Sequence, residues 1–195
     1  MTRKLAVTFD YRCPFAYNGH ASVIAAVRGG ADIEARPHAF SLDQIHVPEG
    51  EAPVWERDPS ERGTGVLALL YGISVRDHFP EQFVDAHLAL FAARHEHAKK
   101  LGKEDVLREA VASAGVDPDA VADHVHGGES LATLAKEHTQ AVDRWGVFGV
   151  PTFIEGENAA FVRFMERDRA DDVERVLDLL DWVGLNEFKR PTVPN

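Results

Sequence analysis

Apolar and polar positions near the N-terminus follow two different periods. Residues 4–10 alternate loosely and are bounded by charge, which predicts a short central strand. Residues 14–28 carry apolar positions at helical spacing and end before two glycines, which predicts a helix with a glycine stop. Residues 33–40 alternate again, and Pro37 within them favours the edge or the end of a strand. This order of strand, helix and strand predicts a βαβ unit of a partly parallel sheet.

The middle of the chain has the pattern of helices. After a loop rich in Pro, Glu, Asp and Gly, residues 64–145 predict four or five amphipathic helices separated by glycine and proline. The second of these is expected to begin at a proline and to bury Val84, Leu88 and Phe91, which are spaced at i, i+4 and i+7. Ser130 is expected to be the N-cap of the last one.

The pattern returns to strands near the C-terminus. Residues 146–154 form a glycine-rich approach followed by a strand, a turn follows, and residues 159–165 are expected to pair back as the next strand. Residues 168–182 have four apolar positions at helical spacing and predict a closing helix. The tail, residues 186–195, contains two prolines and is expected to lie extended.

The complete order predicts the fold class. It is β-α-β, a helical insertion, and then β-β-α, which is an α/β thioredoxin-like fold with an inserted all-helical domain. The expected boundaries place a discontinuous thioredoxin-like domain at 1–62 and 144–195, and the helical insertion at 63–143.

Composition and charge narrow the function classes. The 195 residues are 45% hydrophobic and can bury a core, and 21 basic against 32 acidic residues give a net charge of −11. Binding to nucleic acid or to an anionic membrane surface is therefore disfavoured. The single cysteine excludes an intramolecular disulfide, and no apolar run approaches the roughly 18 residues of a membrane span. We expect a cytoplasmic protein in a reducing compartment.

The only cysteine, Cys13, lies between the first strand and the first helix. Pro14 suits the first helical position, so the sulfur is expected at the start of the helix. Unpaired N–H groups and the helix dipole favour a thiolate there. The alternative is a small, buried and inert cysteine.

Two segments resemble a known family. The stretch Phe9-Asp10-Tyr11-Arg12-Cys13-Pro14-Phe15-Ala16-Tyr17 is similar to the strand-to-helix active-site motif of the DsbA family of thioredoxin-fold proteins, and Gly149-Val150-Pro151-Thr152-Phe153 is similar to its loop with a cis proline. The resemblance is to the cytoplasmic branch, which also contains 2-hydroxychromene-2-carboxylate isomerases and kappa-class glutathione transferases. It implies that Cys13 is catalytic, that Pro151 is cis, and that Val150 offers backbone groups to an extended thiol-bearing ligand.

The resemblance has one important departure. Oxidoreductases of the family have Cys-x-x-Cys, and Ala16 occupies the second position here, either as the natural residue or as a replacement that traps a mixed disulfide. Internal resolution of a mixed disulfide needs the second thiolate, so a cycle by Cys13 needs an external thiol. The leading hypothesis is a monothiol oxidoreductase, and the alternatives are a thiol-dependent isomerase or S-transferase and a non-catalytic binding protein.

The resemblance also assigns roles to the neighbours of Cys13. Tyr11 and Phe15 would flank the sulfur and line an apolar slot beside Pro14. Arg12 is the cation nearest to Cys13 and would hold the thiolate or pair with a ligand carboxylate. The alternative for each of these residues is a structural role.

The implied partners and co-reactants are small. No tightly bound cofactor is expected, and a low-molecular-weight thiol such as glutathione or a functional equivalent is the implied co-reactant. The second substrate would be an apolar small molecule or a protein thiol. A homodimer is left open.

Ten histidines raise the question of a metal site. His95 and His97 point about 200° apart on a regular helix, and His87 lies two turns from His95, so these side chains do not chelate one ion without other ligands. His124 and His126 have the same spacing of two. We expect no metal site and solvated helix faces. His20 lies about two turns from Cys13, which is too far for a catalytic base.

Overall fold

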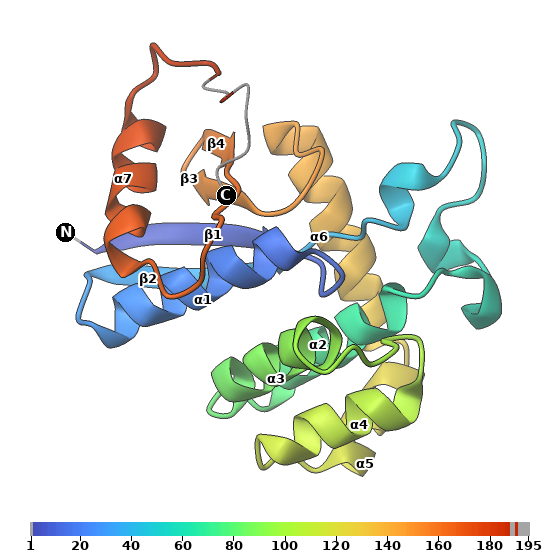
Figure 1. The fold of residues 1–195 in the computed structure, drawn as a ribbon. Coiled ribbons are helices and arrows are strands. Elements are labelled where there is room, and N and C mark those ends of the chain that lie inside the picture. Colours follow the sequence, from blue (N-terminus) through green and yellow to red (C-terminus); the bar gives the residue numbers. More distant parts are fainter. Residues whose placement is uncertain (1, 188–189, 191–195) are drawn as a thin grey trace.

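The computed structural model describes residues 2–187 and 190 and has a thioredoxin-like α/β architecture (Figure 1). The elements are β1 (Arg3–Phe9), α1 (Pro14–Arg28), β2 (Ile33–Ala39), α2 (Val66–His78), α3 (Phe83–His95), α4 (Glu104–Ser113), α5 (Pro118–His126), α6 (Glu129–Trp145), β3 (Thr152–Glu155), β4 (Asn158–Phe161) and α7 (Ala170–Asp181). The predicted fold class, a β-α-β unit, a helical segment and a β-β-α unit, is confirmed.

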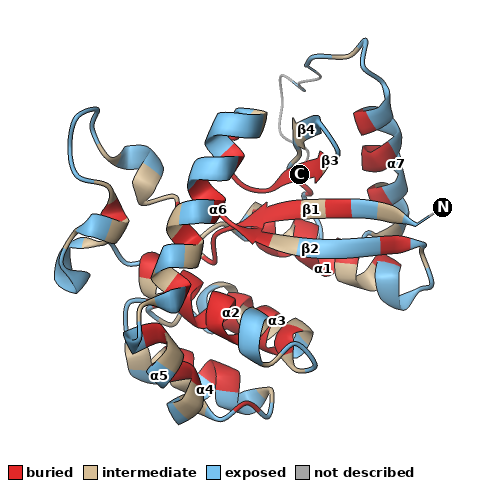
Figure 2. Cartoon of the chain, turned by 180° about the vertical axis from the view of Figure 1, so that it is seen from behind, coloured by how far each residue is buried: buried red, intermediate tan, exposed pale blue. Residues whose placement is uncertain are grey.

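The described strands form one mixed sheet in the order β2-β1-β3-β4. Strands β1 and β2 are parallel, with Phe9 opposite Ala39, whereas β3 is antiparallel to both β1 and β4. Helices α1 and α7 cover one face, and α6 crosses the other face near the end of β2 (Figures 1 and 2). Leu5 and Val7 pack with α1 and α7, which explains why alternate residues of β1 are apolar.

The helical segment and the sheet share one apolar core. One buried cluster joins Phe9 and Ile154 of the sheet to Leu69, Phe91 and Leu134 of the helices, and the elements of both parts are red on their facing sides in Figure 2. The division into domains at 1–62, 144–195 and 63–143 stays a prediction.

Gly72 of α2 lies directly against the side chain of Tyr11. A Cβ atom at this position would overlap the Tyr11 phenol. The absence of a side chain therefore lets α2 approach the turn that follows β1. This contact ties the helical segment to the segment that carries Cys13.

Two details of the helices differ from the sequence prediction. Helix α3 begins at Phe83, and Val84 and Leu88 are only half-buried, whereas His87 and Leu90 are buried. The helix is apolar around most of its circumference, so its contacts with α1, α2 and α4 decide which stripe is buried.

Ser130 is not the N-cap of α6. Gly128, with a positive φ of 88°, occupies that position, and Ser130 lies within the first turn. The Ser130 hydroxyl is buried and has no hydrogen-bond partner among the described residues.

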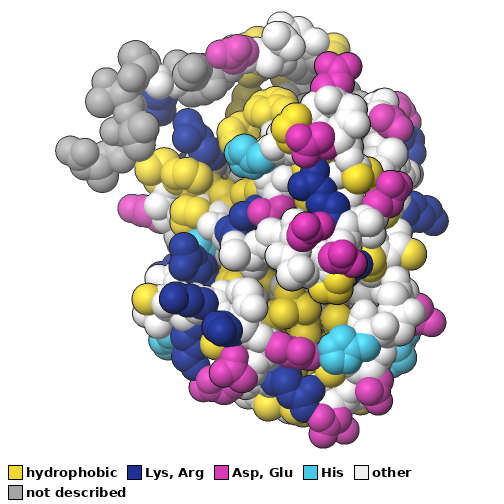
Figure 3. All heavy atoms as spheres, turned by 90° about the vertical axis from the view of Figure 1, so that its right-hand side faces the viewer, with side chains coloured by type: hydrophobic (Ala, Val, Ile, Leu, Met, Phe, Trp, Pro, Cys, Tyr) yellow, Lys and Arg dark blue, Asp and Glu magenta, His cyan; other side chains and the backbone are white. Residues whose placement is uncertain are grey.

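The strands β3 and β4 are shorter than predicted, and the closing helix is confirmed, with Val173, Val176, Leu177 and Leu180 buried. The expected extended conformation of the tail falls mostly on residues 188–189 and 191–195, which lie outside the described residues. Acidic and basic side chains both occur over the face in Figure 3, with apolar side chains between them.

None of the described helices has both the length and the apolar character that a membrane span needs.

Candidate active site at the start of the first helix

Cys13 is the N-cap residue of α1. Its backbone is extended, with φ −91° and ψ 116°, and Pro14 begins the helix. The side chain is half-buried, and its Sγ donates a hydrogen bond to the carbonyl oxygen of Val150 at 3.3 Å. The sulfur and the Val150 carbonyl therefore face each other across 137 positions of sequence.

The Val150–Pro151 peptide bond is cis, and side chains from β1 and β3 fix the loop that contains it. The Thr152 N–H donates to Thr8 Oγ1 at 2.8 Å, and both threonine hydroxyls donate to the carbonyl oxygen of Gly149. Thr8 belongs to the strand that leads to Cys13, so the same strand positions both the loop and the sulfur.

Burial raises the pKa of the Cys13 thiol above its ordinary value. The N–H groups of Ala16 and Phe15 lower this pKa, as expected at the start of a helix, and Arg163 acts in the same direction, whereas Asp10 raises it. The loss of solvation outweighs the helix start. Burial of the sulfur therefore acts against the thiolate that the helix start favours, and the Cys13 thiol donates its hydrogen bond to Val150.

The raised pKa predicts the pH profile of alkylation. We expect the iodoacetamide rate of folded protein to rise with pH to values above the ordinary thiol pKa of about 8.5, because only the thiolate reacts. The matched control is the same protein unfolded in urea, in which Cys13 is solvated. A midpoint lower in the folded than in the unfolded protein would contradict the burial argument, whatever the absolute rates.

Arg12 is held by two carboxylates. Its Nη1 donates to Asp43 at 2.7 Å, its Nε donates to Asp10 at 3.3 Å, and Asp10 also accepts from the backbone N–H groups of Arg12 and Leu42. These contacts show that Arg12 fixes the turn after β1, which corrects the prediction that it holds the thiolate. Arg163 is the cation that lowers the Cys13 pKa.

Tyr11 does not line an apolar slot. It is fully buried, packs edge-on against Phe9 and Phe91, and its hydroxyl lies 2.8 Å from His87 Nδ1. Phe15 is half-buried, and the Arg163 guanidinium lies 5.2 Å from the centre of its ring.

Comparison with known proteins agrees with this geometry. The family model of the DSBA-like thioredoxin domain matches residues 4–178. The chain belongs to this family. No curated protein gave a significant match.

Solved structures show the same fold. A thioredoxin-like oxidoreductase from Silicibacter pomeroyi has 18% identity and a TM-score of 0.61, covering 90% of this chain and 86% of its own. DsbA from Pseudomonas aeruginosa has 19% identity and a TM-score of 0.60, with 91% and 82% covered. A 2-hydroxychromene-2-carboxylate isomerase has 16% identity and a TM-score of 0.65, with 91% and 96% covered.

Behind the active-site turn of this DsbA-like chain lies a buried row of polar side chains. His87 Nε2 lies 3.1 Å from His20 Nδ1, and His20 Nε2 lies 3.4 Å from the carbonyl oxygen of Thr8. Because a carbonyl only accepts, His20 Nε2 carries a proton, His87 Nε2 donates to His20, and the Tyr11 hydroxyl donates to His87. We call this row, Tyr11–His87–His20–Thr8, the buried relay.

The buried relay is neutral at pH 7. Burial lowers the pKa of His20 to about 4 and that of His87 well below its ordinary value, and it raises the Tyr11 pKa well above its ordinary value. Through the contact between Tyr11 and His87, the buried relay connects the turn before Cys13 to α3. That His20 is not the base of Cys13 stays a prediction.

His95 also contacts the active-site turn. Its Nε2 lies 2.9 Å from the carbonyl oxygen of Tyr11, so this nitrogen donates there, and burial lowers its pKa. His87 and His95 are therefore not on a solvated helix face, which corrects the sequence prediction. No local signal distinguishes them, because their partners lie 76 and 84 positions away.

Two hollows of the DsbA-like fold lie away from the sulfur. One of about 180 Å³ lies beside the buried relay and is lined mainly by apolar side chains of α1, β2 and α3. The other, of about 390 Å³, is an open groove lined by residues that include Tyr17, Leu88 and Arg167. The geometry at Cys13, and not the size of a hollow, identifies the candidate active site.

Proposed function

We propose that this DsbA-like protein is a thiol-dependent oxidoreductase in which Cys13 forms a mixed disulfide that an external low-molecular-weight thiol resolves. One observation supports this most directly. Cys13 begins α1 opposite the Val150 carbonyl, while Ala16, fully buried on the same helix, occupies the position of a resolving cysteine.

The proposed cycle needs two exchange steps. The Cys13 thiol first loses its proton to solvent, and the thiolate attacks one sulfur of a disulfide RSSR. The S–S bond breaks, and RS⁻ leaves and takes up a proton. Cys13 is then oxidised in a mixed disulfide, and half of the original disulfide is reduced. An external thiolate next attacks the R sulfur, the Cys13 thiolate leaves, and its protonation restores the hydrogen bond to Val150.

Two exposed phenylalanines next to the Gly149–Val150 loop support an apolar partner. Phe148 is 68% exposed, and its ring lies 5.2 Å from that of Phe161, which is also exposed. Gly149 and Val150 connect this pair to the carbonyl that faces Cys13. We propose that this surface contacts an apolar small molecule or a protein that carries the second thiol or disulfide.

A second function is favoured by the hydrogen bond that the half-buried Cys13 sulfur donates to Val150. A neutral Sγ–H that already donates to Val150 can instead donate to the sulfur of a bound thiol such as glutathione. Cys13 would then orient the thiol without forming a bond to it, and the reaction would be an isomerisation or an S-transfer, as in the isomerase that shares this fold.

Replacing Cys13 by serine separates the two functions. For the oxidoreductase we expect Cys13→Ser to lose all turnover and all adduct formation with glutathione disulfide, observed by intact mass. For the isomerase or transferase we expect serine to retain activity, because a hydroxyl still donates to a bound thiol. Cys13→Ala is the matched control. If the wild type forms no adduct and shows no glutathione-dependent turnover, while Cys13→Ala keeps normal partner binding, both enzymatic proposals are wrong and a binding protein remains.

A further inference from the structure

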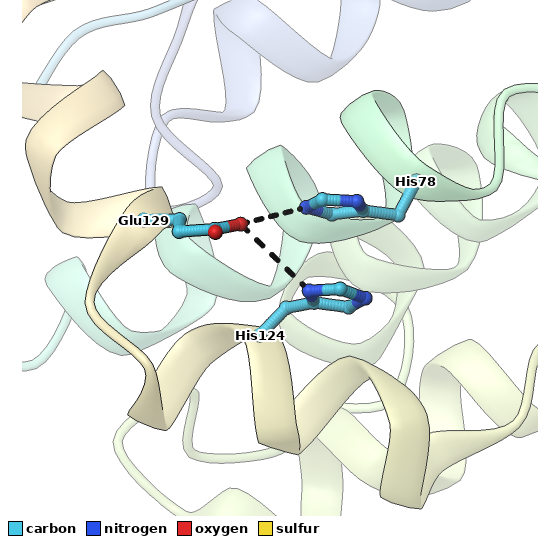
Figure 4. Close-up of side chains that lie close together, drawn as sticks. All are labelled: His78, His124 and Glu129. Atoms are coloured by element: carbon cyan, nitrogen blue, oxygen red, sulfur yellow. Dashed lines mark ion pairs between the residues drawn. The ribbon is translucent and has the colours of Figure 1, made fainter.

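Three helix ends meet within the helical segment. His78 is the last residue of α2, His124 lies in the last turn of α5, and Glu129 is the first residue of α6. Figure 4 shows the two imidazole rings stacked, with the carboxylate of Glu129 beside the nitrogen edge of both. These residues are 46 and 5 positions apart in sequence, and only the packing of α2 against α5 and α6 brings them together.

The separations of the polar atoms match the edges of a coordination polyhedron. His78 Nε2 lies 3.4 Å from Glu129 Oε2, and His124 Nδ1 lies 3.8 Å from the same oxygen. All three potential ligand atoms lie within 4.8 Å of one another. Zinc bonds of about 2.0–2.1 Å at tetrahedral angles place neighbouring ligand atoms about 3.4 Å apart.

The stacked rings define the movement that binding requires. Their centres are 3.6 Å apart and their planes differ by 5°, so the two lone pairs lie in nearly parallel planes. An ion between them needs the rings to tilt toward a common point. Both side chains are partly exposed, at 31% and 36%, and this tilt changes side-chain torsions without moving the helices.

Helix dipoles explain why histidines and a glutamate occur at these helix ends. They do not explain why the three side chains lie next to one another. Histidines near the ends of α2 and α5 and a glutamate at the start of α6 each suit the local dipole. A single exposed ion pair would contribute little, and Glu129 is 69% exposed. Two imidazole nitrogens directed at one carboxylate from three separate helices is the arrangement that a transition-metal ion uses.

We propose that His78, His124 and Glu129 bind one divalent transition-metal ion of the Zn²⁺ type, with water completing its coordination. Two imidazoles and one carboxylate are the donor set of open zinc sites, whereas Ca²⁺ and Mg²⁺ prefer oxygen ligands throughout. The bound ion joins the ends of α2, α5 and α6, and so it stabilises the helical segment.

The test is titration of metal-free protein with ZnCl₂, with Cys13 replaced by serine so that the thiol does not compete. We expect one ion per chain by calorimetry, and an increase of Tm of about 5 to 10 °C at zinc concentrations a hundredfold above Kd. Co²⁺ should give the visible absorption of a tetrahedral site, which a nonspecific ion does not.

Matched variants assign the ligands. We expect His124→Ala and Glu129→Gln each to weaken binding at least tenfold, and His126→Ala to leave it unchanged, because His126 lies on the same helix but contacts Glu104 instead. If either ligand variant is misfolded by circular dichroism, His78→Gln provides the same test. One-to-one binding that survives both ligand variants, or the absence of saturable zinc binding, would overturn the proposal.

Discussion

Cysteine in place of Ala16 is expected to convert the protein into a dithiol enzyme. Residues 13 and 16 are three positions apart at the start of α1, which separates their Cα atoms by about 5 Å, within the range that a disulfide bridges. The new thiol would be as buried as the Ala16 side chain and therefore shielded from external thiols. Cys13 is the cysteine with which it can form a disulfide. We expect Ala16→Cys to release mixed disulfides at least about tenfold faster than wild type, because an intramolecular thiol replaces an external one.

Intact mass and disulfide reductase assays measure this conversion. Oxidised Ala16→Cys should lose two hydrogens and show no free thiol, and reduced protein should show two thiols. Ala16→Ser is the control for the volume of one added atom, whose burial costs about 1–3 kcal/mol. A variant that folds but forms no internal disulfide would show that residue 16 is not the resolving position.

Acid is expected to destabilise the protein through its buried histidines. The pKa values of His20 and His138 are lowered by burial to about 4, while a solvated histidine has a pKa of about 6.5. The unfolded chain therefore binds more protons between these values, so stability is complete above pH 6.5 and falls as the pH drops toward 4. Each shift is worth about 3 kcal/mol when complete, and His87 adds to the same loss.

Urea unfolding at pH 7.5 and pH 4.5 tests this dependence. In the wild type, the Ser41 N–H donates to His138 Nδ1 at 3.2 Å. His138→Gln removes this titrating group and leaves a side-chain oxygen that can accept the same hydrogen bond. We expect the difference in unfolding free energy between the two pH values to shrink by about 2 kcal/mol in this variant. His97→Gln, at an exposed position, is the control. An equal change in both variants would argue against a role for burial.

The order of elements was predictable because its signals are local. Alternation in β1, the proline at the start of α1, the glycines after α1 and the apolar stripe of α7 each follow from a few neighbouring residues. The buried stripe of α3 was not predictable, since that helix is apolar on several sides and its neighbours choose between them. The N-cap of α6 was also not predictable: Gly128, two positions before Ser130, adopts the left-handed conformation and occupies the N-cap position.

The positions of the site residues were predictable only where a motif defines them. Cys13 and Val150 lie opposite each other as the family resemblance implied, but the roles of Tyr11 and Arg12 depend on distant partners. Tyr11 is buried by α2 and α3, and Arg12 is held by Asp43. Desolvation of the thiol was not predictable either, because it depends on the complete fold, whereas the helix start is visible in the sequence.

The missing side chain at Gly72 limits which helical segments could replace this one in a chimaeric protein. A side chain there would displace the Tyr11 phenol, and with it the turn that carries Cys13. A helical segment exchanged for that of a relative would therefore have to bring its own small residue at this contact, or a smaller partner for it. The turn that carries Cys13 and helix α2 are therefore coupled by this contact. In the sequence, residues 11 and 72 are separated by α1, β2 and a long loop.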